Sequence, residues 1–253
     1  MSQPIVAIRG LHYRYPAGGQ DALNGVEFAT HAGERVGIIG SNGAGKTTLL
    51  LHIMGILRGN GEIWICGERL SRKTVESIRE KIGMVFQDPR HQLFLPNLSD
   101  DIALGPLAAG KSSEDIFHDV ATALDNLQLT ELKDRSPFDL SMGEQKRAAL
   151  ASVLVMKPDI ILFDEPTANL DPAGRRAFIK LVNSLTQTLI IAGHDLDMIY
   201  ALCDRVVIMD GGRIVAEGQT ENILGDALLL AAHRLELPLS LELARYRQKF
   251  TLN

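Results

Sequence analysis

Apolar and polar positions follow two rhythms along the chain, and the changes of rhythm divide it into three stretches. Up to about residue 85, short apolar runs separated by Gly, Asn and Asp predict strands of a mixed sheet with one helix between them. From about 92 to 156, the strand signals stop and apolar residues recur at helical spacing. From residue 159, strands and helices alternate again, as in a parallel sheet. The chain is therefore expected to form a core sheet interrupted by a helical lobe.

The expected strands are short and the expected helices are capped or periodic. The strands cover Ile5–Ile8, Val26–Ala29, Arg35–Ile39, Gly61–Cys66, Ile82–Phe86, Ile160–Phe163, Thr188–Ala192 and Arg205–Met209. The helices cover Lys46–Met54, a run from Ser112 to Leu127, Glu144–Met156, Pro172–Leu185 and Leu196–Leu202.

A glycine-rich loop follows the third expected strand and opens the first expected helix. It fits the pattern GxxxxGK[ST], in which glycines let backbone N–H groups approach phosphates. The free N–H groups at the helix start and the lysine add positive charge, and the threonine hydroxyl can ligate Mg²⁺. The alternative, a glycine-rich turn with a surface lysine, leaves the flanking strand and helix unexplained. We therefore predict ATP-type nucleotide binding at Gly40, Ser41, Asn42, Gly43, Ala44, Gly45, Lys46, Thr47 and Thr48.

Composition limits the remaining function classes. A chain of 253 residues suits one large α/β domain with insertions. With 26 Lys and Arg against 31 Asp and Glu, and no long basic run, backbone-driven nucleic-acid binding has little support. Apolar stretches such as Ala148–Met156 are shorter than the roughly 18 residues of a membrane span, and the N-terminus lacks a signal-peptide core. We therefore expect a cytoplasmic protein, with Cys66 and Cys203 in structural roles.

Two carboxylates, Asp164 and Glu165, end the apolar run Ile160–Phe163. Ligands of open α/β sheets bind at this edge, where the strands end. Asp164 is suited to hold Mg²⁺ through water, and Glu165 can polarise the water that attacks the γ-phosphate. The alternative is a strand that simply ends in two acids at the solvent.

A second anion-binding helix start is predicted at residues 140–145, LSMGEQ, which we call the signature segment. Ser141 is placed as an N-cap, and Gly143 leaves the backbone open to an anion. Since the phosphate loop already encloses one nucleotide, this end can serve the nucleotide of a partner. An ordinary capped helix is the alternative.

With these motifs in order, the chain resembles an ATP-binding cassette (ABC) ATPase. The resemblance spans about residues 4 to 220 and adds Gln87, the turn at residues 168–171 and His194. It implies a P-loop α/β fold with a mixed or parallel core sheet, an antiparallel β subdomain and the helical lobe at about 92–156. The ATPase domain is then expected at 1–222, followed by a short helical tail at 223–253. The family's usual LSGGQ here carries Met142 and Glu144 in place of Gly and Gln.

The resemblance also assigns roles to residues around ATP and Mg²⁺. Tyr15, with Tyr13 as a competing candidate, would stack on adenine, and Gln87 would sense Mg²⁺ and the attacking water. Ser141 and Gly143 would contact the γ-phosphate bound by a partner in a head-to-tail dimer, with Glu144 also among the cofactor-binding residues. The remaining assignments are Asp171 in the turn linking the two sites and His194 bridging the γ-phosphate and the partner.

The segment Val85–Phe94, which contains FQDPRHQLF, resembles the energy-coupling-factor (ECF) importers. Two further features resemble that group's cobalt and nickel members. The signature segment continues into Lys146-Arg147, and the helical tail is broken at Leu237-Pro238. These ATPases usually form homodimers, peripheral on the inner face of the membrane, that drive an integral membrane coupling protein and a substrate-binding membrane component. A vitamin importer of the same type, or a soluble ABC ATPase such as an iron–sulfur assembly ATPase, stays an alternative.

Overall fold

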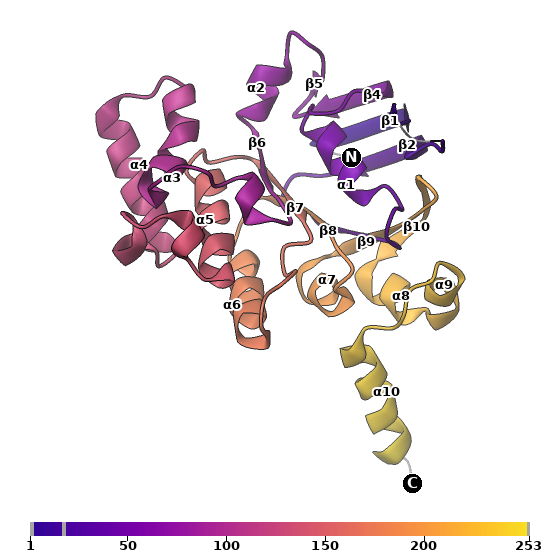
Figure 1. Cartoon of the computed structure of the whole chain (residues 1–253). Coiled ribbons are helices and arrows are strands. Elements are labelled where there is room, and N and C mark those ends of the chain that lie inside the picture. Colours follow the sequence, from indigo (N-terminus) through magenta and orange to yellow (C-terminus); the bar gives the residue numbers. More distant parts are fainter. Residues whose placement is uncertain (1–2, 17–18, 252–253) are drawn as a thin grey trace. The chain divides into compact units, whose positions relative to one another are not determined.

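The computed structural model describes residues 3–16 and 19–251 and divides the chain into two compact α/β units. The first unit comprises residues up to 78 together with those from 188 onward, and the second comprises 79–187. Figure 1 shows that the second unit holds the helices predicted as an inserted lobe. Within the described residues, no helix combines the length and the apolar character needed to cross a membrane.

An antiparallel sheet begins the first unit, in the order β2-β1-β4-β5. Buried and exposed positions alternate along β2, as expected when one face packs on a core. A bulge interrupts β1 between Ile8 and Leu11, and Gly10 there has φ +56°. The bounds are β1 Val6–Tyr13, β2 Leu23–Thr30, β4 Asn60–Ile65 and β5 Glu68–Arg69.

The expectation of one mixed sheet over the first 85 residues is wrong, because β3 (Arg35–Ile39) pairs with strands far along the chain. It lies parallel to both β8 (Thr188–Ala192) and β9 (Arg205–Asp210), and β10 (Arg213–Gln219) pairs antiparallel with β9. Four of the five β3 residues are buried, as is all of β8. Burial on both faces is typical of parallel strands covered by helices.

Three helices of the first unit, α1, α7 and α8, pack beside these strands. At Gly37 of β3, an added Cβ would lie 2.6 Å from Ile199 Cγ2, so glycine lets α7 approach the strand closely. The carboxylate of Asp197 in α7 accepts hydrogen bonds from the N–H groups of Leu239 and Ser240, which begin the last helix. The bounds are α1 Lys46–Ile53, α2 Val75–Arg79, α7 Leu196–Leu202, α8 Thr220–Gly225, α9 Ala227–Ala232 and α10 Leu239–Thr251.

The second unit combines the parallel pair β6–β7 with the helical lobe. At Gly83 of β6, an added Cβ would overlap Val153 Cγ1, so α5 packs directly on this strand. Asp119 of α4 accepts from Lys111 and Lys157, which ties the lobe's loops together. The bounds are β6 Ile82–Val85, η1 Pro89–His91, α3 Leu98–Ala108, α4 Ser113–Asn126, η2 Thr130–Leu132, η3 Pro137–Asp139, α5 Met142–Leu154, β7 Ile160–Asp164 and α6 Pro172–Asn183.

Candidate nucleotide site

The phosphate loop connects β3 to α1 within the first unit. Gly40, Gly43 and Gly45 all have positive φ, at +153°, +81° and +104°. An added Cβ at Gly40 would overlap Met209 O, and one at Gly45 would lie 2.6 Å from Ala22 O. At Gly43 an added Cβ would meet no atom within 4 Å, so this glycine is required by its backbone conformation alone. The loop thus has the shape in which N–H groups can surround an anion.

Lys46 follows the loop as the first residue of α1, and its side chain is folded across the loop. Its Nζ donates hydrogen bonds to the carbonyl oxygens of Gly40 and Ser41, at 2.8 and 3.2 Å. Only 7% of Lys46 is exposed, so this ammonium is held next to the glycine backbone. Gly45 is the N-cap of α1 and supplies no capping side chain, which leaves the helix start available to phosphate oxygens. The loop therefore fits the triphosphate of a nucleotide.

Tyr15, the predicted adenine contact, lies beside α1. Its hydroxyl is 3.2 Å from Thr48 Oγ1, and Tyr15 is 40% exposed. Tyr13 is less exposed and makes edge-to-face contacts with Tyr15 and His52, with ring centroids 4.9 and 4.6 Å apart. Tyr13 contacts two rings whereas Tyr15 is the more exposed of the two, which favours Tyr15 over Tyr13 as the candidate for the adenine contact.

His194 lies two residues after the end of β8, at the same sheet edge as the phosphate loop. Ile38 of β3 lies opposite Ala192 of β8, and the next residue, Gly193, donates its N–H to Ile38 O at 3.1 Å. The phosphate loop begins two residues after Ile38, so both segments leave adjacent parallel strands. The structure therefore brings exposed His194 and the phosphate loop to one edge of the first unit.

The predicted acids lie at the corresponding edge of the second unit. Val85 of β6 pairs with Phe163 of β7, so Gln87 and the Asp164–Glu165 pair follow neighbouring strands. Asp164 is only 4% exposed, Glu165 is half-buried and Gln87 is exposed. Glu165 has φ +46°, a conformation that a residue other than glycine adopts at an energetic cost. Carboxylate oxygens are ligands that Mg²⁺ prefers, which suits Asp164 to its predicted role.

A buried lysine to which no motif gives a role, Lys146 of α5, contacts these catalytic candidates. Its Nζ donates to the backbone oxygen of Gln87 at 2.7 Å and to that of Glu165 at 3.4 Å. Desolvation lowers the pKa of Lys146 to about 8, while the carboxylates of Asp88, Asp164 and Glu165 oppose this shift. Its position on the face shared by buried Ala149, Leu150 and Val153 is the sequence signal for burial.

The signature segment forms a capping box at the start of α5. The N–H of Glu144 donates to Ser141 Oγ at 3.4 Å, while the N–H and hydroxyl of Ser141 donate to Glu144 Oε2 at 2.8 and 2.7 Å. The bonds from Ser141 hold the pKa of Glu144 below its ordinary value. An added Cβ at Gly143 would meet nothing within 4 Å. The helix starts two residues earlier than expected, with exposed Ser141 as its N-cap.

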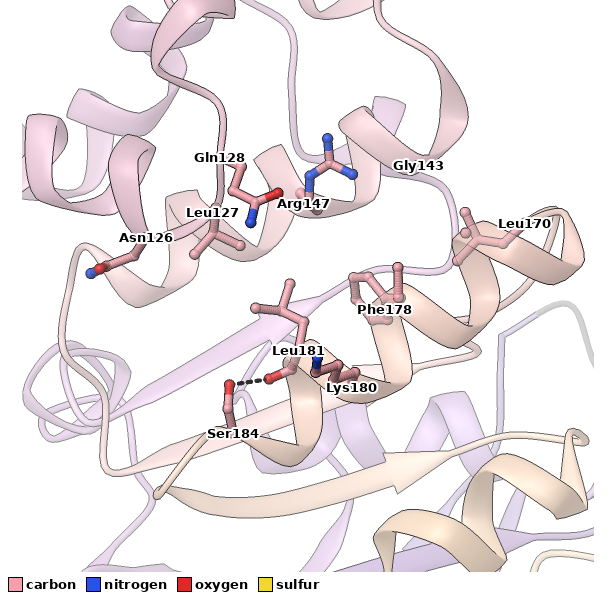
Figure 2. Close-up of a pocket in the computed structure, with 12 residues that line it drawn as sticks. Asn126, Leu127, Gln128, Gly143, Arg147, Leu170, Phe178, Lys180, Leu181 and Ser184 are labelled. Atoms are coloured by element: carbon pink, nitrogen blue, oxygen red, sulfur yellow. Dashed lines mark hydrogen bonds between the residues drawn. The ribbon is translucent and has the colours of Figure 1, made fainter.

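A cavity of about 360 Å³ lies on the α6 side of α5, with Gly143 in its wall. Figure 2 shows Gln128 and Arg147 on one side of this cavity and Phe178 and Leu181 of α6 on the other. Asp171, the predicted link between two sites, is the N-cap of α6, and its Oδ1 accepts from the N–H of Gly174 at 2.6 Å. Its carboxylate is therefore already used within its own helix start.

Together, the α/β fold and the phosphate loop define a P-loop nucleotide-binding protein with a second glycine-containing helix start. A family model described as "ABC transporter" matches residues 23–168. The chain belongs to this family, whose members hydrolyse ATP, and its fold is that of ABC cassettes.

Relatives and solved structures agree with this membership. A protein of Gloeobacter violaceus named as an ABC transporter ATP-binding protein is 46% identical over 244 residues, covering 95% of this chain and 99% of that protein. The energy-coupling factor transporter ATP-binding protein EcfA of Methanothermobacter thermautotrophicus is 40% identical, covering 94% of this chain and 78% of that protein. The structure of cbiO1 from Clostridium perfringens, titled as part of the ABC transporter complex cbiONQ, matches with TM-score 0.80 and 35% identity, covering 96% of this chain and all of that one.

A further solved structure shows a similar cassette with ADP and phosphate bound. The dimeric post-hydrolysis state of the ATP-binding cassette MJ0796, bound to ADP and Pi, matches with TM-score 0.76 and 27% identity. It covers 85% of this chain and 98% of that one. ATP with Mg²⁺ is thus the cofactor set that the family membership supports for this chain.

Proposed function

We propose that this chain is the ATP-hydrolysing energy-coupling subunit of an ECF-type membrane importer. The observation that carries the proposal is the similarity over nearly the whole chain to proteins named EcfA and cbiO1. The segment Val85–Phe94 adds a structural argument, because it is anchored to α5. The side-chain amide of Gln92 donates to Ala149 O at 2.7 Å and to Ser152 Oγ at 2.9 Å.

At the active site, the phosphate loop binds the triphosphate of ATP, and Tyr15 stacks on its base. Thr47 and Asp164 hold Mg²⁺ together with Gln87. Glu165 polarises the attacking water, and His194 contacts the γ-phosphate. The proposal requires the groups of both units to reach the same nucleotide. Its support is the loop geometry, the strand-end position of both acids, and the oxygen chemistry of the proposed magnesium ligands.

Two copies of the chain are proposed to pair head to tail around two ATP molecules. Ser141 and Gly143 of one copy then face the γ-phosphate held by the phosphate loop of the other. Glu144 lies beside them at the same helix start, and Asp171 lies in the turn between the sites. Two observations support this arrangement. Ser141 at the capped start of α5 is exposed, and the space beside the Gly143 Cα holds no other atom within 4 Å of an added Cβ. The post-hydrolysis structure of MJ0796 is itself dimeric.

The proposed contact with the membrane partner is the end of the Gln92-anchored segment. Phe94 is 60% exposed, whereas its neighbour Leu93 is buried. The carboxylate of Asp101 accepts from the N–H groups of Phe94 and Leu95, so the backbone that presents Phe94 is fixed. A large apolar side chain on a fixed backbone is typical of a docking anchor. The partner in this proposal is an integral membrane coupling protein with a substrate-binding membrane component, which places the ATPase on the inner face of the membrane.

The test is affinity purification of the tagged protein from detergent-solubilised membranes and from the cytosol of its native host. Multispanning membrane proteins should co-purify with wild type and be lost with Phe94→Ala. The matched control is Phe117→Ala, because Phe117 of α4 is 79% exposed but lies outside the segment. Soluble partners alone, with wild type, would overturn the importer proposal and favour a soluble role such as iron–sulfur assembly.

Cobalt or nickel is the proposed cargo, with a vitamin as the alternative. The basis is the likeness of the signature continuation and of the C-terminal helical tail to cobalt and nickel members. The purified complex identifies the cargo directly, by uptake of radiolabelled Co²⁺, Ni²⁺ or vitamins into liposomes that contain ATP. Vitamin uptake without metal uptake would refute the cobalt or nickel assignment and keep the importer.

A further inference from the structure

Lys146 is a fully buried lysine whose side chain lies at the end of β6 and β7. A buried ammonium is costly unless every donor is used, so its partners define what the residue does. Its Nζ donates to two backbone oxygens, one on Gln87 and one on Glu165. These residues follow two neighbouring parallel strands, while Lys146 belongs to the helix that begins at the signature segment.

Both partners of Lys146, Gln87 and Glu165, lie where the backbone leaves regular secondary structure. Gln87 is two residues beyond the end of β6, and Glu165 follows β7 with φ +46°. Such a conformation persists only when its surroundings determine it. The Glu165 carbonyl accepts both from Lys146 Nζ and from the N–H of Ala168 at 3.1 Å. These two donors fix the direction of the peptide group that follows the proposed catalytic carboxylate.

The opposite side of α5 is less closely packed. The adjacent residue, Arg147, faces the cavity in Figure 2, and its Nε is buried without a hydrogen-bond partner. On the sheet side, Val153 packs against Gly83 and Gln92 bonds to Ala149 O, so α5 is fixed there by specific contacts. Of these contacts, the Lys146 bonds are the ones made directly to the two catalytic candidates.

We infer that Lys146 is a positioning residue for ATP hydrolysis, whose ammonium ties the backbone of Gln87 and of Glu165 to the signature helix. The inference rests on the proposed catalytic roles of Gln87 and Glu165. It adds that the direction of the Glu165 side chain depends on where α5 lies. A displacement at the Ser141 end of this helix is therefore passed to both catalytic residues through one side chain.

The test compares Lys146→Met, which removes the charge at similar length, with Lys146→Arg, which keeps it. Lys146→Met should lower kcat about 10- to 100-fold, because a small misplacement of a catalytic group costs this much. The Kd for ATP should stay within about twofold, since the phosphate loop lies in the other unit and keeps its own contacts. Lys146→Arg should recover most of the lost kcat. Lys180→Met, at an exposed lysine of α6, is the matched control.

If Lys146 only stabilised the fold, its loss would lower Tm, and kcat would fall only as far as the protein unfolds. A positioning lysine predicts the opposite pattern: Met replaces a desolvated charge with an apolar chain, so the Tm of Lys146→Met should equal or exceed that of wild type while kcat falls. If the Met variant does not fold, Lys146→Gln, which keeps two N–H donors without charge, should lower kcat several-fold at unchanged ATP affinity. Retention of more than half of the wild-type kcat in a folded Met or Gln variant overturns the inference. So does a kcat loss matched by an equal loss of ATP affinity. The Glu165→Gln variant separates the proposed catalytic role of Glu165 from the positioning role of Lys146. If Glu165→Gln still hydrolyses ATP, the catalytic role of Glu165 is overturned.

Discussion

The N-cap of α5 has two proposed functions, and substitutions of Ser141 can separate them. In the fold, Ser141 Oγ accepts from the N–H of Glu144 and donates to the Glu144 carboxylate. In the proposed dimer, the same hydroxyl contacts the γ-phosphate bound by the other copy. Alanine removes both functions, glycine removes the hydroxyl but is a tolerable N-cap, and threonine keeps both.

The expected sizes follow from the contacts. Replacing an N-cap serine by alanine costs about 0.5–2 kcal/mol, and by glycine only a few tenths. The N–H of Glu144 is 3.4 Å from Ser141 Oγ, a long bond, and the N–H of Ser141 keeps its bond to the carboxylate in any variant. A loss of about 1 kcal/mol is therefore expected for alanine, or about 2–4 °C in Tm for a chain of this length. Loss of a hydrogen bond to a charged phosphate costs about 1.5–3 kcal/mol, which is roughly 10- to 150-fold in turnover.

Thermal unfolding and steady-state ATPase assays on Ser141→Ala, Ser141→Gly and Ser141→Thr provide the measurement. Alanine should lower both Tm and kcat, glycine should lower kcat equally at nearly unchanged Tm, and threonine should resemble wild type. A glycine variant with wild-type kcat would refute the phosphate contact. An alanine variant with wild-type Tm would refute the capping contribution.

Further predictions concern the catalytic base, the phosphate loop and the lobe. Glu165→Gln should bind ATP, fail to turn over and accumulate as a dimer in size-exclusion chromatography with ATP; a monomer there would contradict the sandwich. Lys46→Ala should abolish ATP binding in equilibrium titration, and tight retention would contradict the loop assignment. The ammonium groups of Lys111 and Lys157 lower the pKa of Asp119 to about 2 from 3.8. Because this pKa is lower in the folded state, the stabilisation is complete above pH 4 and lost as the pH falls toward 2. Asp119→Asn should thus lower Tm at pH 7, with the difference shrinking over that window; a constant difference would contradict the cause.

Local patterns predicted the elements well because each depends on neighbours in sequence. The helix after the phosphate loop starts at Lys46 as expected, and the strand ending in Asp164 is buried throughout. Partners of strands are non-local, and there the prediction failed. The sequence pattern groups β3 with the strands next to it along the chain, whereas in the structure β3 pairs with β8 and β9. Its continuous apolar run, set against the alternation in β2, is the signal that separates the two sheets.

The edge strand β10 was not predicted for a related reason. In Arg213–Gln219 exposed and half-exposed positions alternate, without one buried residue, so no apolar face stands out in the sequence. Its extended conformation is stabilised by antiparallel pairing with β9, which its own residue pattern does not indicate. For the site, glycine spacing identifies the phosphate loop, since positive φ is a local requirement. The bond from Lys146 to Gln87 spans 59 residues, and no motif within α5 indicates it.

One helix connects the contacts on which these proposals depend. Ser141 caps α5, Lys146 reaches the carbonyl oxygens of Gln87 and Glu165, and Ser152 accepts from Gln92 of the segment assigned to the membrane partner. At a rise of 1.5 Å per residue, these points lie along about 16 Å of a single rod. A helix of this length is stiff, so it cannot move at its capped end without moving the side chains along it. Closure on a partner's nucleotide, alignment of the catalytic backbone and displacement of the membrane-facing segment would then be one motion. Substitution of Lys146 would interrupt the alignment of the catalytic backbone. It would leave the closure on the partner's nucleotide and the displacement of the membrane-facing segment in place.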